Sequence, residues 1–586
     1  MLATPKNFER LLAPFRGQPR LILDTETTGL HCWTTDRVVG LSLATPDLRH
    51  RVYAPVRHEV GENITASQYR QITKLLSARG LILTGWNCKF DVEMLLQDGL
   101  RLPRTLEDVM LACHLLNEND KPFELKRWAA KHVDPSAGDA EAALEKRLRQ
   151  VVKEQGIKGI DRGSLKAYIK LLDPAEAEPY ACDDVYYTEV LRRLVLPHLR
   201  RWRLSDLWRE SNRYLWEVLR MEMRGMKLDV ALMEQYSKEA KKNYRRAEKN
   251  LFRIAGHEIN PRSPKQLCAF LGTTSSRKEI VSELGTPEAE ALLSYRNWFK
   301  VENDYYSVWR ELRDASDVLH PNLLLHGTGT GRQSARTPPL HGTPRYRPEY
   351  KVRNVIIARP GYLILSADYQ QNELRIAASL AEEEKMAAIF ASGGDIHQAV
   401  ADALRIGGPD PRSIGKNINF ATIYGAGASK LSLMAKIPFE EADKHLRQYR
   451  TTYWRLRYTA KAYQRLAESQ GYIRLWTGRV RHFNSEIFAQ PRDAFNSAVQ
   501  GGGAEMLRIA ICRMAPQLRK LDAWILLQIH DSVLVEVPLE QVVACAQIIK
   551  REMENFPHWM VPPVVDLKLG TSWGNMKELV NLRRIA

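Results

Sequence analysis

The sequence contains no long hydrophobic run. No stretch of about 18 apolar residues occurs in its 586 residues, so we expect no transmembrane helix. The first twenty residues, MLATPKNFERLLAPFRGQPR, lack the apolar core of a secretion signal. Cysteine is scarce: seven are scattered along the chain without a CxxC pair, which excludes a disulfide framework and a cysteine zinc site. These absences predict a cytoplasmic protein with reduced cysteines.

Acidic residues are outnumbered by basic ones. The chain has 86 Lys and Arg against 69 Asp and Glu, a net charge of +17. Such an excess indicates a polyanionic partner, either nucleic acid or an anionic membrane surface. Because membrane segments are missing, nucleic acid is the better interpretation. The length predicts about four compact units, and the hydrophobic content of 44% is ordinary for a globular protein.

Two aspartates follow short apolar runs of strand type, Asp368 in LILSADYQQNELR and Asp531 in LLQIHDSVLVEV. A helix-like run, RSIGKNINFATIYG, lies between them. Every fourth residue of this run drifts by only about 40° on a helix, so four side chains share one side: Arg412, Lys416, Phe420 and Tyr424. Two carboxylates can hold a pair of hard cations, and this helix face can contact a triphosphate, a sugar and a base in that order. A nucleotidyl transferase needs this layout.

Three further acidic blocks lie in the first part of the chain. Asp24 and Glu26 alternate in LILDTE and therefore point to the same side of a strand. Asp91 follows in GWNCKFD, and Tyr180 and Asp184 lie one helical turn apart in PYACDDVYY. By itself DTETTG would be taken for a helix-capping turn, but the three blocks in order favour a metal-dependent site.

We expect strands at LILDTETTGL, VVGLSLAT and LILTGW, helices over most of 206–325 and 380–515, and a strand at YLILSADY. The segment HGTGTGRQSARTPPLHGTP is predicted to be a loop. The segment WILLQIHDSVLVEVP is predicted to be a hairpin with His530 and Asp531 at its tip.

The segments DYQQNELR, RSIGKNINFATIYG and QIHDSVLVEV resemble the three polymerase motifs of family A DNA polymerases, the DNA polymerase I family, in the family's order. Smaller blocks of the family are similar to TGTGRQSA, GGDIHQ and RDAFNSAVQG. The acidic blocks and Tyr180 resemble 3′-5′ exonucleases of the DEDD type that use tyrosine. The resemblance covers nearly the whole chain.

The resemblance implies an α/β and α+β multidomain protein. A ribonuclease H-like 3′-5′ exonuclease domain is expected at 1–205, followed by a right-hand polymerase: a thumb at 206–325, a palm at 326–390 and 505–586, and the fingers with their connection to the palm at 391–504. Only about twenty residues precede the first strand. We therefore expect no 5′-nuclease domain and the compact layout of bacteriophage polymerases.

The implied function is template-directed addition of dNTPs to a primer 3′-hydroxyl by two-metal phosphoryl transfer, with proofreading, in phage or bacterial DNA replication. Two Mg²⁺ ions are expected in each active site, and we expect Mn²⁺ to substitute for them. The expected partners are primer-template DNA and dNTPs. We expect a monomer in the bacterial cytoplasm, and leave open whether a helicase, a primase, a single-strand-binding protein or a processivity factor joins it.

The resemblance also assigns roles to single residues. The expected metal ligands are Asp368 and Asp531 in the polymerase site, and Asp24, Glu26, Asp91 and Asp184 in the exonuclease site, where Tyr180 would orient the attacking water. The expected dNTP contacts are Arg412, Lys416 (also catalytic), Phe420, Tyr424, Glu373, which crowds the sugar's 2′ position, and His397. The expected DNA contacts are Arg332, Arg492, Asn496, Gln500 and His530.

Three departures from the family pattern are notable. Ser532 stands where the family usually has Glu, Asn372 replaces a usually apolar residue, and PPLHGTP at 338–344 differs from the usual PNLQNIP. Two other functions would fit part of the sequence: a ribonuclease D type nuclease with a decayed C-terminal part, and a catalytically silent nucleic-acid-binding protein. The complete ladder from Arg412 to Tyr424 and the two sets of metal ligands argue against both.

Overall fold

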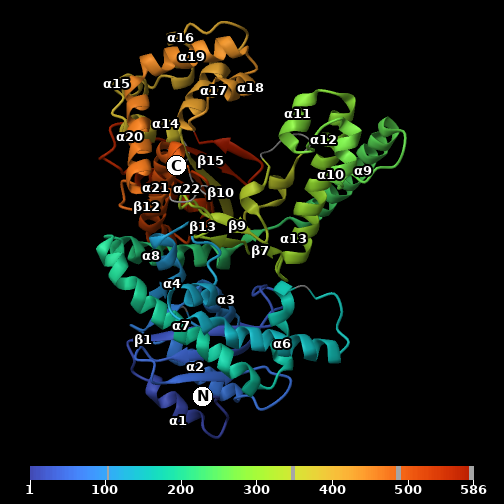
Figure 1. Ribbon diagram of the computed structural model, residues 1–586, viewed down its shortest axis with the longest axis vertical. Coiled ribbons are helices and arrows are strands. Elements are labelled where there is room, and N and C mark those ends of the chain that lie inside the picture. The colour runs from blue at the N-terminus through green and yellow to red at the C-terminus, as the bar shows by residue number, and fades with distance from the viewer. Residues whose placement is uncertain (102–104, 161, 345–349, 484–489, 580–586) are drawn as a thin grey trace.

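The computed structural model describes residues 1–101, 105–160, 162–344, 350–483 and 490–579. All of the site residues predicted above lie within these ranges. The molecule has three parts. The N-terminal part lies at the bottom of Figure 1, a helical arm lies above it at the right, and a second sheet carrying a group of helices lies at the upper left. In the described ranges, no helix is long and apolar enough to cross a membrane. All seven cysteines are free thiols.

The N-terminal part is built on a five-stranded mixed sheet with the order β3-β2-β1-β4-β5. β1 is antiparallel to β2 and parallel to β4. The strands are β1 (Arg20–Thr27), β2 (Val38–Ala44), β3 (Arg51–Pro55), β4 (Ile82–Gly85) and β5 (Thr105–Asp108). The helices are α1 (Phe8–Leu12), α2 (Ala66–Leu76), α3 (Cys88–Gln97), α4 (Val109–Leu116), α5 (Leu125–His132), α6 (Asp139–Glu154) and α7 (Pro174–Arg201). This α/β architecture agrees with the expected exonuclease fold.

Two short strands of this sheet were not predicted from the sequence. These are β3, with five residues, and β5, with four. The segment LILTGW, which was expected to be the third strand, therefore contains the fourth strand of the sheet, β4. Both missed strands lie at the edges of the sheet. Strands this short carry too few residues to show an alternating pattern, so pairing with a neighbour decides their conformation.

A long helix, α8 (Ser205–Arg224), crosses from the N-terminal sheet to the C-terminal one and packs against both β5 and β13. Two small pairs of strands lie beside it: β6 (Met226–Lys227) with β7 (Val318–Leu319), and β8 (Asn322–Leu324) with β9 (Ser334–Arg336). β9 lies in the segment predicted to be a loop throughout. The arm consists of α9 (Val230–Ala255), α10 (Pro264–Leu271), α11 (Lys278–Leu284), α12 (Pro287–Lys300) and α13 (Ser307–Leu312).

The second sheet has the order β13-β14-β10-β15-β16. Its strands are β10 (Tyr362–Tyr369), β13 (Trp524–Ile529), β14 (Ser532–Pro538), β15 (Val565–Gly570) and β16 (Met576–Glu578). The predicted hairpin, β13 and β14, is confirmed. Residues alternate along β10: Leu365, Ala367 and Tyr369 are buried in the core, while Ser366 and Asp368 point to the other, more open side.

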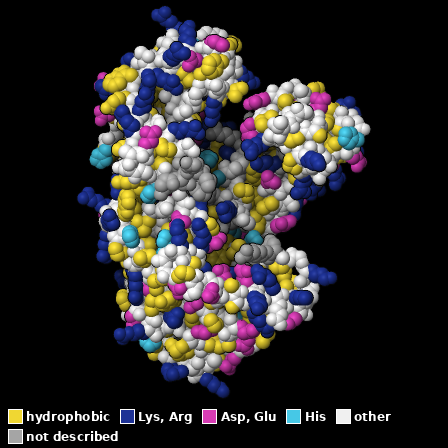
Figure 2. Space-filling view, viewed as in Figure 1, with side chains coloured by type: hydrophobic (Ala, Val, Ile, Leu, Met, Phe, Trp, Pro, Cys, Tyr) yellow, Lys and Arg dark blue, Asp and Glu magenta, His cyan; other side chains and the backbone are white. Residues whose placement is uncertain are grey.

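The remaining elements surround this sheet and extend from it. Helices α14 (Asn372–Leu380), α21 (Ala494–Arg519) and α22 (Val542–Glu554) pack close to it. The helices farthest from the N-terminal part form what we call the helical lobe (Figure 1). The lobe consists of α15 (Glu384–Ala391), α16 (Ile396–Ala403), α17 (Pro411–Ile423), α18 (Ala428–Ala435), α19 (Phe439–Thr452) and α20 (Trp454–Gln470). The hairpin of β11 (Tyr472–Arg474) and β12 (Val480–His482) follows α20 and packs against the N-terminal part. Figure 2 shows the surface hollowed between this lobe and the arm.

Buried ion pairs join the N-terminal part to the rest of the chain. Lys89 on α3 contacts Glu222 on α8, with 2.6 Å between Nζ and Oε2, and both side chains are buried. Arg481 on β12 contacts Glu118, which follows α4, with 2.7 Å between Nη1 and Oε1. Because a buried charge is costly without its partner, these pairs hold the two halves in one fixed orientation.

Candidate active sites

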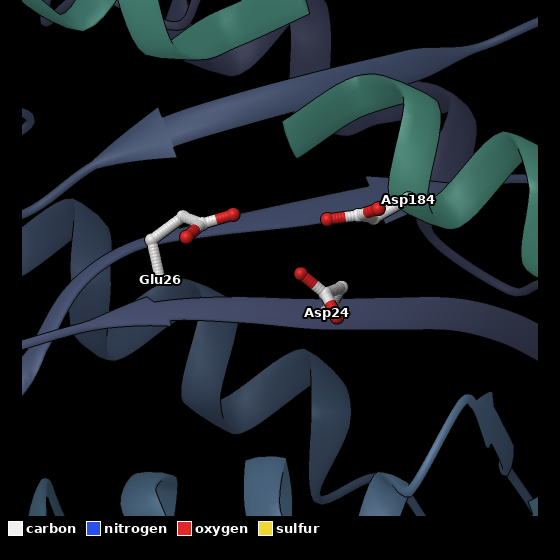
Figure 3. Close-up of side chains that lie close together, drawn as sticks. All are labelled: Asp24, Glu26 and Asp184. Atoms are coloured by element: carbon white, nitrogen blue, oxygen red, sulfur yellow. The ribbon is translucent and has the colours of Figure 1, made fainter. Parts of the chain in front are cut away.

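Three carboxylates meet at the end of β1. Asp24 and Glu26 extend from the same side of this strand, and Asp184 reaches them from α7, which packs across the sheet. One oxygen atom from each lies within 4.8 Å of the other two, and the carboxyl groups point toward a common space (Figure 3). The sequence predicted this grouping from strand alternation and from the order of the acidic blocks.

Burial and mutual repulsion act strongly on these groups. Burial, followed by the charge of Asp184, raises the pKa of Glu26 to about 8 and raises that of Asp24 well above its ordinary value. Glu26 Oε1 is buried and has no hydrogen-bond partner. Three adjacent carboxylates cannot all ionise unless a cation neutralises them. An all-oxygen set with an unsatisfied buried oxygen therefore fits a hard divalent ion such as Mg²⁺.

Two lysines that the sequence did not reveal complete this site. Lys126 on α5 is buried and lies 2.8 Å from Asp184, measured between Nζ and Oδ1. Lys166 donates a hydrogen bond of 3.0 Å to the Tyr180 hydroxyl. Burial raises the pKa of Tyr180, so its phenol stays protonated. These lysines supply positive charge beside the carboxylates and hold Tyr180 at the edge of the site.

Asp91 stands apart from the three-carboxylate group. Its Oδ1 accepts hydrogen bonds from Thr25, 2.9 Å from the backbone N and 2.7 Å from Oγ1. Thr25 lies between Asp24 and Glu26, so Asp91 fixes the backbone that positions them. Burial raises the pKa of Asp91 to about 7, while the hydrogen bonds from Thr25 oppose the shift. Its predicted role as a metal ligand stays a prediction.

The second pair of aspartates lies on neighbouring strands of the other sheet. Asp368 is near the end of β10, and Asp531 directly precedes β14. The Cα of Asp368 is paired with that of Ser532, and the Tyr369 backbone N donates to the Asp531 carbonyl at 3.3 Å. Burial raises the pKa of Asp531. The structure thus brings together two acidic residues that are far apart in the sequence.

The predicted ladder lies on one helix. Asp410 caps α17 by accepting from the Ser413 backbone N at 3.0 Å. Along the helix Arg412 and Lys416 are exposed, Phe420 is half-buried, and Tyr424 follows at the end. The Phe420 and Tyr424 rings are stacked, with centroids 5.9 Å apart. Two cations and two rings therefore share a face, as the spacing predicted.

A chain of contacts links the ladder to the second aspartate pair. The Tyr424 hydroxyl donates to Glu373 Oε2 at 2.7 Å, and Arg332 Nη2 donates to Glu373 Oε1 at 2.6 Å. Arg332 and Glu373 both lie near enough to Asp531 to act on its pKa, Arg332 lowering it and Glu373 raising it. Residues from a loop, β10, α14, α17 and the β13–β14 turn thus form one site.

Close packing sets the position of α17 against α16. A Cβ at Gly415 would lie 2.3 Å from the His397 carbonyl oxygen, so only glycine allows the two helices to approach this closely. His397 is buried, its ring lies 6.0 Å from Phe420, and burial lowers its pKa to about 4. Arg412 Nε donates to Asp395 at 2.6 Å, and this contact holds its guanidinium at the start of the ladder.

The remaining predicted DNA contacts lie around this site. Arg492 precedes α21 and is exposed, and Asn496 and Gln500 follow on the same side of that helix. Burial raises the pKa of Tyr424, and a hydrogen bond with Gln500 opposes this shift. Asn496 Oδ1 is buried without a partner. His530 is exposed in the β13–β14 turn, with a left-handed φ of 52°.

Comparison with known proteins gives the family. The sequence profile of DNA polymerase family A matches residues 230–575, more than half of the chain. The chain belongs to DNA polymerase family A. A 3′-5′ exonuclease profile matches residues 1–197. A family A polymerase with an exonuclease domain is therefore confirmed, as is the predicted combination of the two folds.

Curated relatives of this family include thermostable DNA polymerase I from Thermus aquaticus, 30% identical over 87% of this chain and 59% of that protein. The Thermus filiformis enzyme is 31% identical over 75% of this chain and 58% of its own length. This chain thus spans about three fifths of such relatives. A solved structure titled "POL domain of Pol1 from M. smegmatis complex with DNA primer-template and dNTP" shares the fold, with a TM-score of 0.79 and 21% identity over 98% of this chain and 99% of that one.

Several site residues could not be found from the family motifs. Lys126 and Lys166 act through contacts with residues distant in the sequence. Asp395 lies within the GGDIHQ block, but its contact with Arg412 was not predicted. Asp566 on β15 is the Cα partner of Asp368, on the side opposite Ser532. Its only sequence signal is one exposed acid in the alternating pattern VVDLKLG. Pairing between strands brings it beside Asp368.

Proposed function

We propose that this chain is a template-directed DNA polymerase that extends a primer and proofreads its product. The observation that carries the proposal is the linked site just described, in which the cationic and aromatic face of α17 is joined through Glu373 and Arg332 to Asp531. The titles of the relatives and of the solved structure support DNA and dNTPs as substrates.

In the proposed polymerase site, Asp368 and Asp531 would hold two Mg²⁺ ions. Bound there, the ions would supply positive charge for the transferred phosphate and for the primer hydroxyl. We infer that Mn²⁺ can replace them. Arg412 and Lys416 grip the triphosphate, Arg412 from an orientation already set by Asp395. Phe420 packs on the sugar and base, with His397 behind it. We infer that Tyr424 closes the slot for the templating base, so it has to leave Glu373 when a nucleotide binds.

The proposed DNA contacts are long polar side chains, namely Arg332, Arg492, Asn496, Gln500 and His530. Such groups suit the minor groove, where the acceptors are nearly the same for every base pair, so they sense pairing geometry without reading sequence. The buried, unpartnered Asn496 Oδ1 lies in this set. We expect sequence-independent binding.

In the proposed exonuclease site, Asp24, Glu26 and Asp184 would hold metal ions, and Asp91 would either join them or fix β1 through Thr25. Tyr180, kept protonated by burial, orients the attacking water. Lys126 neutralises charge on Asp184. A mismatched primer end would be degraded there one nucleotide at a time.

The regions take the usual roles of a right-hand polymerase in this proposal. Residues 1–205 form the exonuclease domain and 206–325 the thumb, of which the arm is the main part. Residues 326–390 and 505–586 form the palm, and 391–504 the fingers with their connection to it. We propose that the chain acts as a monomer with DNA in the cytoplasm of a bacterial cell, in phage or bacterial replication.

One assay tests the proposal against its alternatives. A labelled primer on a template is incubated with Mg²⁺, with and without dNTPs. We expect extension with dNTPs and shortening without them. Shortening under both conditions would leave a nuclease alone, and retention without either reaction would leave a silent binding protein.

A further inference from the structure

The outer face of α20 carries a stripe of aromatic and basic side chains that the polymerase and exonuclease sites do not use. The stripe consists of Trp454, Tyr458, Lys461 and Arg465. Their spacing of four, three and four residues keeps them on one side of the helix over about 16 Å. The opposite side packs inward through Leu456, Tyr463 and Ala467. The stripe is therefore not required for the packing of this helix.

The two rings of the stripe are open to solvent. Trp454 is 55% exposed and Tyr458 is 63% exposed, and their centroids lie 6.5 Å apart in an edge-to-face arrangement. Arg455 lies over the Trp454 ring and is anchored to Glu384, which fixes the start of the helix. Two adjacent, oriented aromatic faces on a surface helix are ready to stack against flat ligands.

Basic residues predominate around the rings, and the acidic neighbours Glu383 and Glu384 contact Arg455 at the start of α20. Residues 444–467 contain seven Lys and Arg and no Asp or Glu. Arg457, Lys461 and Arg465 are exposed and, among the residues that the structure describes, form no ion pair. A solvated surface helix usually mixes charges of both signs. A largely basic face around exposed rings instead matches a polyanion that exposes flat groups.

We propose that this stripe binds single-stranded DNA outside the polymerase cleft. Unpaired bases can stack on Trp454 and Tyr458 while their phosphates contact Lys461 and Arg465, the combination of stacking and charge that single-strand binding uses. Duplex DNA fits less well because its base faces are already stacked. α20 packs against α21 and the turn before it, which carry the proposed minor-groove contacts. The stripe thus lies on the outside of the wall whose inside faces the duplex.

The strand has two sources, the unpaired template ahead of the primer end and a strand displaced from it. The test compares Kd values of the full chain in EDTA, which prevents degradation, for three labelled substrates. These are a primer-template with a short overhang, one with a long template overhang, and one with a displaced flap. Tighter binding of the long overhang than of the short one would identify the strand as the unpaired template. Tighter binding of the flap would identify it as the displaced strand.

The variant is Trp454→Ala/Tyr458→Ala, and the matched control is Phe439→Ala, an exposed ring at the start of α19. We expect the double variant to lose about tenfold in affinity for the substrate that wild type binds more tightly than the short overhang. Its affinity for the short overhang should not change. The control should behave as wild type. The proposal would be overturned if the long overhang or flap bound more tightly than the short overhang by the same factor in all three proteins, or if it bound no more tightly in any of them. An acidic protein would then be the better candidate partner for the stripe.

A second measurement does not depend on stacking. Lys461→Gln/Arg465→Gln should reduce the slope of log K against log salt by about 1.4 on the substrate that wild type binds more tightly than the short overhang. The slope for the short overhang should not change. The inference rests on the proposed binding of primer-template DNA, and the two fail separately. If wild type neither binds the short overhang nor extends a primer, the proposed function is refuted. If only the stripe proposal is wrong, wild type still binds the short overhang and extends a primer.

Discussion

At the scale of single residues, Glu26 shows that a candidate metal site is electrostatically unfavourable without its metal. Its carboxyl is buried, borders Asp184, and has one oxygen without a partner. The folded protein therefore keeps a proton on Glu26 at a pH where the unfolded chain has lost it. Folding stability of the metal-free protein falls as the pH rises from about 4.5 to about 8.

Glu26→Gln should remove this loss. The amide is neutral at every pH, so the Tm of the EDTA-treated variant should exceed that of wild type increasingly over this range. We expect the free energies of unfolding to differ by about 5 kcal/mol above pH 8, and not to differ in acid, where both residues are neutral. Adding Mg²⁺ should close or reverse the gap. Equal Tm values above pH 8 would contradict the shifted pKa.

Phe420 should make the enzyme discriminate against dideoxynucleotides. A normal dNTP can use its own 3′-hydroxyl to contact its phosphates, whereas a dideoxynucleotide lacks this group and the phenylalanine ring cannot replace it. The unpaired charged oxygen costs about 1.5–3 kcal/mol, or roughly 10- to 150-fold in selectivity. Phe420→Tyr should erase most of this preference with little effect on dNTPs. The measurement is the ratio of kcat/KM for dNTP and ddNTP, and an unchanged ratio would remove Phe420 from the sugar pocket.

Ser532 should be dispensable for the chemistry. A serine hydroxyl brings no negative charge to a metal site, so Asp368 and Asp531 have to suffice, with Asp566 adding a carboxylate on the other side of Asp368. We expect Ser532→Ala to keep extension within about tenfold, roughly 1.4 kcal/mol of barrier. A loss as large as that of Asp531→Ala, measured as single-turnover extension, would show a role for Ser532 in the reaction.

At the scale of elements, the position of α17 depends on its contact with α16. Gly415→Ala would place a Cβ 2.3 Å from a backbone oxygen, so α17 would have to shift. Because α17 carries the ladder, we expect KM for dNTPs to rise about tenfold or more, a loss of roughly 1.4 kcal/mol. Gly407→Ala is the matched control, since a Cβ there meets nothing within 4 Å. Exonuclease activity should not change in either variant.

The elements that carry the sites were predicted well from the sequence. Regular spacing gave the ladder on α17, apolar runs gave β1, β10 and the β13–β14 hairpin, and alternation placed Asp24 beside Glu26. These signals are local, because each lies within one helix or strand. The family resemblance then gave the order of the domains.

The parts that were missed depend on contacts between distant segments. β3, β5 and β9 are too short to show a pattern and exist because a neighbouring strand pairs with them. Lys126 reaches Asp184 from a helix far earlier in the chain, and Asp566 reaches Asp368 through β15. No spacing within a segment encodes such pairs.

At the scale of the whole molecule, the two proposed activities should separate genetically, because they lie on different sheets. Asp368→Ala should abolish extension, by more than about a thousandfold or 4 kcal/mol of barrier, and leave single-strand degradation nearly intact. Asp24→Ala should do the reverse and raise the error rate. The measurements are extension of a matched primer and removal of a mismatched end. Unchanged mismatch removal by Asp24→Ala would refute the exonuclease assignment.

The buried pairs Lys89–Glu222 and Arg481–Glu118 have a kinetic consequence. Halves joined in this way resist movement relative to each other, because movement would separate buried charges from their partners. In the proposed enzyme, a primer end would then pass from one site to the other by opening its own terminal base pairs. The timing of error correction would then be set by how often a primer end frays, so a mismatch would be removed sooner because it unpairs sooner. The protein would then supply two active sites in fixed positions, and the stability of the last few base pairs would set the rate of transfer between them.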